Sequence, residues 1–176
     1  MAFDAVYLSA VLEEVRQRCT GARVDKIHQP SRDTLILHLR GRDSREKLLF
    51  AANPTAPRLH LTGASPENPA EPPMFCMLLR KHLTGARIVS ISQPEHERML
   101  ELEIDTHDEL GFAARKKLVL ELIGRSSNLI LVGSDGRIID CMRRMDFAGG
   151  AERSMMPGMF YRMPPKQNKL SVFDAA

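Results

Sequence analysis

An internal repeat constrains the fold more than any other feature of this sequence. Residues 20–30 read TGARVDKIHQP and residues 84–94 read TGARIVSISQP, so seven of eleven positions are identical at an offset of 64 residues. In each copy an amphipathic helix precedes this segment, and alternating strands and a hairpin follow it. The repeat therefore predicts two similar helix-plus-strands halves, at about residues 3–62 and 73–132.

The ends of the two predicted helices are marked by residues that begin or end helices. Asp4 is the expected N-cap of the first helix, and Pro72-Pro73 begins the second. Gly21 and Gly85 occupy the same place in the two copies, two residues after the last apolar residue of each helix. Glycine commonly ends helices, so each helix is expected to stop there.

Each half contains about four strands with one apolar face, which cannot be buried by that half alone. Packing two such faces together gives an α+β fold, a β-sandwich with flanking helices and pseudo-twofold symmetry. Residues 133–176 form a C-terminal extension. Within it, 137–141 is expected to add a strand, whereas the proline-rich MMPGMFYRMPPKQNK is expected to lie irregularly over the core or to remain disordered.

Composition places the chain among single-domain globular proteins. Its 176 residues are 43% hydrophobic and 27% charged, and no apolar run approaches the ~20 residues of a membrane span. Three widely spaced cysteines without a CxxC pattern predict reduced, packed thiols and a cytoplasmic protein, with neither a disulfide framework nor a zinc site. The N-terminus lacks the pattern of a signal peptide, and no membrane partner is expected.

The stretch KKLVLELIGRSSNLILV, residues 116–132, predicts a hairpin with strands at 118–123 and 129–132. In this pattern Glu121 shares a face with Val119 and Ile123, where a carboxylate is costly to bury unless it is paired. One interpretation is a salt bridge or capping network with the polar turn, residues 124–128. The other is an acid or base of perturbed pKa at a catalytic site.

Catalytic and metal-binding motifs are absent from the sequence. It contains no GxSxG, HExxH, Walker A or GxGxxG pattern, and its six histidines lack metal-ligand spacing. The sequence therefore predicts a domain without a metal, a cofactor or a small-molecule substrate.

Basic residues on predicted loops and helix ends favour an anionic partner. The net charge is only +3, but cations cluster at Arg80-Lys81-His82 and in residues 137–169, which include Arg143 and Arg144. Arg98 follows a Gln-Pro turn, and Arg125, Ser126 and Asn128 lie on the hairpin turn, a composition suited to phosphate and sugar contacts. The alternative for each cluster is a solvated face. The residues alone predict a binding domain, with nucleic acid as a candidate partner.

Several longer strings are far more specific than these short motifs. MAFDAVYLSAVLEEV, PPMFCMLLRKHL, ARIVSISQPEHER, LVLELIGRSSNLILV and PGMFYRMPPKQNK occur in this order from Met1 to about Lys169. In these strings the chain resembles the N-terminal (NFACT-N) domain of the RqcH/NEMF family, whose bacterial members are also called fibronectin-binding protein A. Family members are several times longer, so the resemblance implies that this chain is one domain of a longer protein.

The resemblance implies a role in ribosome-associated quality control. Family members bind a large ribosomal subunit obstructed by peptidyl-tRNA and recruit charged tRNA, in bacteria alanyl-tRNA, to add a C-terminal alanine tail without mRNA. The implied domain is a non-catalytic RNA-binding module. The family's Asp-Arg pair for tRNA falls on Glu97-Arg98, with an acid one methylene longer, and a further contact set maps onto Glu121, Leu122 and Leu129.

The resemblance leaves two alternatives in view. The family fold is said to resemble the N-terminal domain of formamidopyrimidine-DNA glycosylases, which would make the chain a nucleic-acid enzyme. Those enzymes use an N-terminal proline amine as nucleophile, whereas this chain begins Met1-Ala2-Phe3. The older family name implies instead an adhesin that binds fibronectin.

Overall fold

The computed structural model describes residues 5–94, 98–145 and 153–164. The first half contains α1 (Ala5–Cys19), β1 (Arg23–Ser31), β2 (Thr34–Arg40), β3 (Arg45–Ala51) and β4 (Arg58–Leu61). The second half contains α2 (Met74–Leu83), β5 (Arg87–Ser92), β6 (Met99–His107), β7 (Ala113–Glu121) and β8 (Asn128–Val132), and β9 (Ile138–Cys141) follows in the C-terminal extension. The predicted succession of one helix and four strands is therefore present in both halves, and the predicted additional strand is β9. Asp4, the expected cap of α1, lies outside the described residues.

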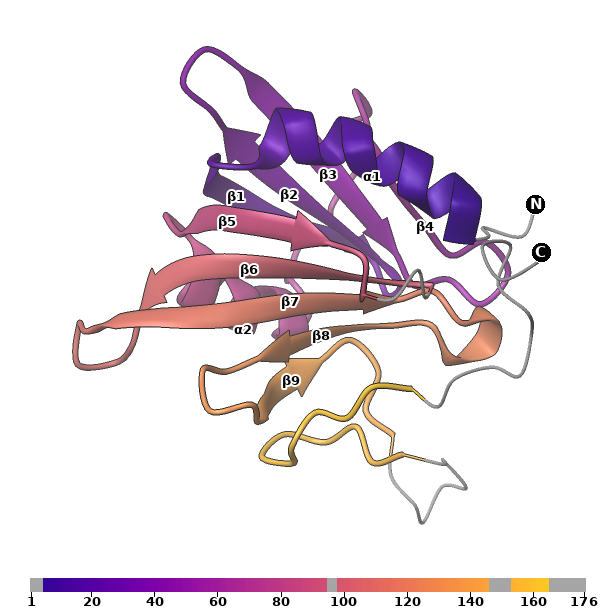
Figure 1. Cartoon of the computed structure of the whole chain (residues 1–176), viewed down its shortest axis with the longest axis vertical. Helices are drawn as coiled ribbons and strands as arrows, with labels where there is room; N and C mark the ends of the chain where they lie inside the picture. The colour runs from indigo at the N-terminus through magenta and orange to yellow at the C-terminus, as the bar shows by residue number, and fades with distance from the viewer. Residues whose placement is uncertain (1–4, 95–97, 146–152, 165–176) are drawn as a thin grey trace, which may run out of the picture.

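The strands form one antiparallel sheet in the order β4-β3-β2-β1-β5-β6-β7-β8-β9. This confirms the α+β class but corrects the prediction of two separate sheets in a sandwich. The first strands of the two halves, β1 and β5, are joined edge to edge. In Figure 1, α1 lies in front of β2 and β3, and α2 is largely hidden behind β6 and β7.

The junction between the halves is built from the repeated TGAR segments themselves. Gly21 N donates to Ile88 O at 2.8 Å, and its symmetry equivalent, Gly85 N, donates to Val24 O at 2.7 Å. Both glycines have positive φ, 86° for Gly21 and 81° for Gly85, which residues with a side chain rarely adopt. The repeat therefore serves two purposes: each glycine ends its helix and also binds the first strand of the other half.

A single hydrophobic core connects the halves. It contains the inward faces of the strands, such as Leu37 and Leu102, together with Leu12 of α1 and Leu79 of α2. The helices are exchanged: α1 packs on β5 as well as on β3 and β4, and α2 packs on β1 as well as on β6 and β9. Each helix thus covers the first strand of the other half, which explains why neither half could bury its apolar face alone.

The outer face of the second half is covered by the C-terminal extension. Met99, Val119 and Ile130 pack there against β9 and against Met155, which follows it in the chain. Residues 153–164 of the extension form no helix or strand and are held by isolated bridges such as Arg137 to Phe160. Residues 153–164, part of the proline-rich stretch, therefore lie over the sheet.

The three cysteines are all buried and unpaired, as predicted. Burial raises the pKa of the Cys19 and Cys141 thiols to about 12. These side chains pack as small apolar groups.

Candidate nucleic-acid interface

Arg98 and the polar turn after β7 lie at the same end of the sheet. Arg98 Nε donates to the Leu122 carbonyl at 3.0 Å, and Leu122 N donates to the Arg98 carbonyl at 2.8 Å. These two bonds join the start of β6 to the end of β7, directly before the short 3-10 helix Gly124–Ser126. Two predicted site elements, Arg98 and the turn, are therefore neighbours. Glu97, the predicted partner of Arg98, lies outside the described residues.

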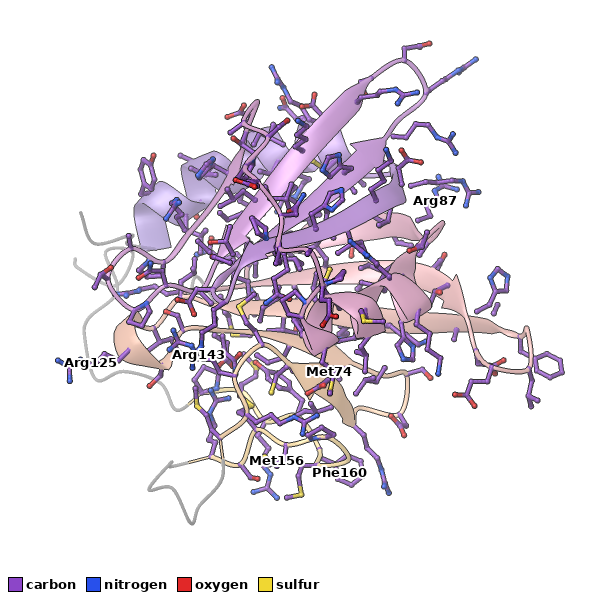
Figure 2. All side chains as sticks on the ribbon, turned by 180° about the vertical axis from the view of Figure 1, so that it is seen from behind. Met74, Arg87, Arg125, Arg143, Met156 and Phe160 are labelled. Carbon is purple, nitrogen blue, oxygen red and sulfur yellow. The ribbon has the colours of Figure 1, made fainter. Side chains whose placement is uncertain are left out.

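Arg125 is exposed at the tip of this turn, and Figure 2 shows it extending away from the body of the protein. Asn128, at the base of the turn, is fully buried. Its Nδ2 donates to the Arg143 carbonyl at 2.8 Å, and its Oδ1 accepts from the backbone N–H of Arg143 at 2.9 Å and of Leu129 at 2.9 Å. Asn128 therefore ties the turn to the chain directly after β9, and its side chain is not available for an external contact.

Arg143 ties this end of the second half to the first half. Its Nη1 donates to the Arg125 carbonyl at 3.1 Å, and its Nη2 donates to Asp33 Oδ1 at 3.1 Å. Asp33 lies in the β1–β2 turn, at the position that the repeat aligns with Glu97. Arg143 and Asp33 are both partly exposed, so Arg143 presents a positively charged edge while it holds the two turns together. We call the surface formed by Arg98, Arg125 and Arg143 the basic edge.

Glu121, the anomalous carboxylate of the hairpin, is completely buried and paired. Arg153 Nη2 donates to Oε1 at 2.6 Å and Nη1 donates to Oε2 at 3.1 Å, while the Tyr161 hydroxyl donates to Oε2 at 2.6 Å. Arg153 Nη1 also donates to the Arg162 carbonyl. The expectation of a paired carboxylate is thus confirmed, but the expected partners in the turn are wrong. The pair comes from the C-terminal extension, which Glu121 anchors to the sheet.

Leu122 and Leu129 are also completely buried, within the central core. Direct contact between a partner and these side chains, or that of Glu121, is therefore not available in this structure. Their position under the basic edge leaves them a supporting role, because they fix the ends of β7 and β8 from which the turn projects.

The other predicted phosphate contacts are placed elsewhere. Arg80 Nε donates to the Ile27 carbonyl at 2.8 Å, so this side chain joins α2 to β1. Lys81 pairs with Glu109 at 3.6 Å, beyond the far end of β6 from Arg98. A strand of nine residues spans about 30 Å at 3.3–3.4 Å per residue, so Lys81 belongs to a different surface. Arg144 forms a two-point contact with Asp140, at 3.1 and 3.2 Å.

Metal and membrane chemistry find no support in the described part of the chain. Among residues 5–94, 98–145 and 153–164, no three His, Cys, Asp or Glu side chains are grouped so as to hold a metal ion. Neither α1 nor α2 is long and apolar enough to cross a membrane.

Comparison with known families decides the classification. Residues 4–176 match the family described as NFACT N-terminal and middle domains. The chain belongs to this family. The NFACT relatives include two proteins named Rqc2 homolog RqcH, from Bacillus subtilis and Streptococcus pneumoniae (D39), which are 38% and 36% identical over 100% and 98% of this chain. The chain spans about a third of their length, 31% and 32% respectively.

More distant and structural relatives extend this comparison. The human ribosome quality control complex subunit NEMF is 28% identical over 141 residues, which are 80% of this chain and 12% of that protein. The N-terminal domain of the fibronectin-binding protein PavA from Streptococcus pneumoniae has a TM-score of 0.91 at 35% identity, covering 97% of this chain and 64% of that structure. The N-terminal structure of the fibronectin/fibrinogen-binding protein from Streptococcus suis gives 0.92 at 33% identity, covering 99% and 66%. The NFACT fold is thus the fold of this chain.

Arg153 and Tyr161 are the important residues that sequence reasoning missed. They lie 32 and 40 residues from Glu121, in a segment whose prolines predict no regular element. A signal was present, since the buried carboxylate required a cation and the extension supplies several. The choice among those cations could not be made without the path of the chain.

Proposed function

We propose that this chain is the RNA-binding domain of a ribosome-associated quality control factor. The observation that carries the proposal is its 38% identity, over its whole length, to a protein named Rqc2 homolog RqcH. The proposed partners are tRNA, in particular alanyl-tRNA, and the large ribosomal subunit carrying peptidyl-tRNA. The proposed outcome is C-terminal alanine tailing of the stalled chain in the cytoplasm, with this domain in a non-catalytic role.

The basic edge is the proposed contact surface for tRNA. Arg125 is exposed, and the guanidinium groups of Arg98 and Arg143 are held by carbonyl and carboxylate partners that fix their direction. Arginine held in this way offers its remaining N–H groups to phosphate oxygens in a defined geometry. Glu121, Leu122, Leu129 and Asn128 support this edge from below, and we propose that Glu97 acts beside Arg98.

Sedimentation tests the proposal directly. The full-length protein that carries this domain is mixed with large ribosomal subunits, either empty or carrying peptidyl-tRNA, and tRNA in the pellet is measured. We expect recruitment of the protein and tRNA to the obstructed subunits, and loss of tRNA with Arg98→Ala. Arg42→Ala, which removes an exposed arginine from the β2–β3 loop, is the matched control. Equal tRNA recovery with both variants would refute the assigned role of Arg98.

A second function, binding of fibronectin, is favoured by the names of the structural relatives. It makes a separate prediction, saturable binding of this chain to immobilised fibronectin that competes with tRNA only if the two ligands share the basic edge. Glycosylase-like catalysis is not favoured, since Glu121 is occupied by Arg153 and Tyr161 and is sealed from solvent.

A further inference from the structure

A cavity of about 630 Å³ lies between the two halves, near the basic edge. It is bordered by the β1–β2 turn, the linker before α2, the start of α2, and the residues from Asp140 to Arg144 that end β9 and follow it. Its volume falls in the range of about 300–1,000 Å³ that is typical of ligand sites. Met142 and Arg144, on either side of Arg143 in the chain, both line it.

The repeat explains the position of this cavity. At the offset of 64 residues, the first residue of α1, Ala5, is equivalent to Pro69, but α2 begins only at Met74. The helix of the second half is therefore shorter by five residues at its start. Pro69 and Met74 both border the cavity, which lies where the missing helical turn would be placed by the symmetry.

The same divergence leaves a buried acceptor without a donor. Ser9 Oγ of α1, in the first half, donates to Gln93 Oε1, in the second half, at 2.8 Å. The equivalent of Gln93 is Gln29, and the equivalent of Ser9 is Pro73, which has no donor. Gln29 lines the cavity and is only 5% exposed, and its Oε1 has no hydrogen-bond partner among residues 5–94, 98–145 and 153–164. A buried acceptor without a partner is costly, so this atom marks a position where a donor from a ligand would be stabilised.

The walls of the cavity combine apolar surface with positive charge. Met74, Phe75 and Met142 supply the apolar part, and Arg32 and Arg144 supply the cations, although Asp140 already engages Arg144. The first N–H groups of α2 also face this region without a side-chain cap, since Pro73 is the cap residue. A helix start of this kind favours a phosphate.

We propose that this cavity receives one unstacked nucleotide of the RNA that binds the basic edge. The base lies between the methionine side chains with an N–H group directed to Gln29 Oε1, and its phosphate lies against Arg32 and the start of α2. Sequence-specific RNA recognition typically uses such splayed-out bases, read at their edges by buried polar groups. This inference rests on the proposed function, for which it names a binding pocket beyond the charged surface.

Methionine methyl NMR of this chain tests the cavity apart from tRNA binding. The chain, labelled at methionine methyl groups, is titrated with each of the four nucleoside 5′-monophosphates, and separately with inorganic phosphate. We expect the methyl signals of Met74 and Met142 to shift with at least one nucleotide. Met77, an exposed methionine on the same helix that does not line the cavity, should not shift and serves as the internal control.

The variant Gln29→Leu removes the acceptor while retaining the size of the side chain, and it should abolish the shifts. Ser9→Ala, which breaks the symmetry-equivalent hydrogen bond from α1 to Gln93, should retain them. Unchanged Met74 and Met142 signals with all four nucleotides, or equal shifts with phosphate alone, would overturn the cavity assignment even if tRNA binds. Nucleotide shifts in a chain that fails to bind tRNA would support the cavity and refute the proposed function.

Discussion

Arg23 in β1 lies directly opposite Arg87 in β5, and the two are the same residue of the internal repeat. The pair marks the point at which the two halves meet edge to edge. Both side chains are exposed, and Arg23 Nη1 donates to the Gly85 carbonyl at 3.1 Å. Like charges at directly opposed strand positions repel each other, so the repeat joins the halves at an electrostatic cost.

Replacing one member of this pair should stabilise the protein. Arg87→Glu turns the repulsion into an attraction without disturbing the bond from Arg23 to Gly85, and we expect the free energy of unfolding to rise by about 0.2–1 kcal/mol. Urea denaturation at low salt measures this rise in the free energy of unfolding. The rise should be smaller at high salt, because the pair is exposed and salt screens it. Arg42→Glu, in the β2–β3 loop, controls for the change in net charge. An equal rise in the free energy of unfolding in Arg42→Glu would show that net charge, and not the contact between Arg23 and residue 87, causes the stabilisation.

The repeat made the two halves and their junction residues predictable, but not their connection. Apolar alternation in β2 and β6 identifies the buried faces, and Gly21 and Gly85 identify the helix ends. Periodicity describes which face is buried and carries no information on which strand edge binds which. The continuous sheet therefore depends on backbone bonds, such as Gly21 N to Ile88 O, whose partner strand the side-chain pattern does not specify.

The predictions for the site residues were correct for some residues and wrong for others, for a similar reason. Arg98 and the turn that carries Arg125 lie at the same end of the sheet, as predicted, because β6 and β7 are consecutive antiparallel strands and the start of β6 pairs with the end of β7. Asn128 has the composition of a contact residue, yet its amide is consumed by Arg143, 15 residues away. Local pattern identifies a polar side chain on a turn, but the partner that buries it depends on the tertiary path.

The buried pair of Glu121 and Arg153 should control the docking of the C-terminal extension. Glu121→Gln leaves the Arg153 guanidinium without a countercharge, and removing one partner of a buried pair costs about 3–5 kcal/mol. We expect this loss in the free energy of unfolding, with faster amide exchange at Met155 and Tyr161 than in the native chain. Glu101→Gln, on the neighbouring strand in a weaker contact of 3.9 Å with Lys117, should change both measurements little. Slow exchange in Glu121→Gln would show that apolar packing alone holds the extension.

Tyr161 should make the stability of the protein fall in alkaline solution. Burial and the adjacent Glu121 carboxylate raise its pKa in the folded state above the ordinary value of about 10. The unfolded chain therefore releases this proton first, so the free energy of unfolding decreases as pH rises above about 10, by at most about 1.4 kcal/mol per pH unit. Below about pH 10 the contribution of Tyr161 to the free energy of unfolding is fully present.

Absorbance titration measures the ionisation of Tyr161 directly, because the chain has two tyrosines and no tryptophan. In Tyr7→Phe the remaining phenol is that of Tyr161, and its ionisation should coincide with unfolding as followed by circular dichroism. Tyr161→Phe should reduce the slope of stability against pH. Ionisation of Tyr161 near pH 10 in a folded protein would contradict its burial against Glu121.

Substitutions of Leu129 should show whether its side chain supports the basic edge from below or contacts RNA directly. Its side chain is completely buried in the central core, so Leu129→Met, which conserves volume, should cost less than about 1.5 kcal/mol of stability and leave tRNA affinity unchanged. Leu129→Ala should cost about 2–5 kcal/mol, and its tRNA affinity should recover at a temperature low enough for the fold to be complete. Loss of affinity in a fully folded Leu129→Met chain would point to direct contact instead.

Salt dependence of tRNA binding should count the phosphate contacts of the basic edge. The logarithm of the association constant should fall linearly with the logarithm of salt concentration, by about 0.7–0.9 for each phosphate contact. Arg125→Ala should weaken binding and reduce this slope by about one contact, because Arg125 is exposed and its side chain can reach a phosphate. Arg42→Ala is again the control and should leave the slope unchanged. Filter binding over a range of salt concentrations measures both quantities, and a flat dependence would show that the basic edge does not hold the RNA backbone.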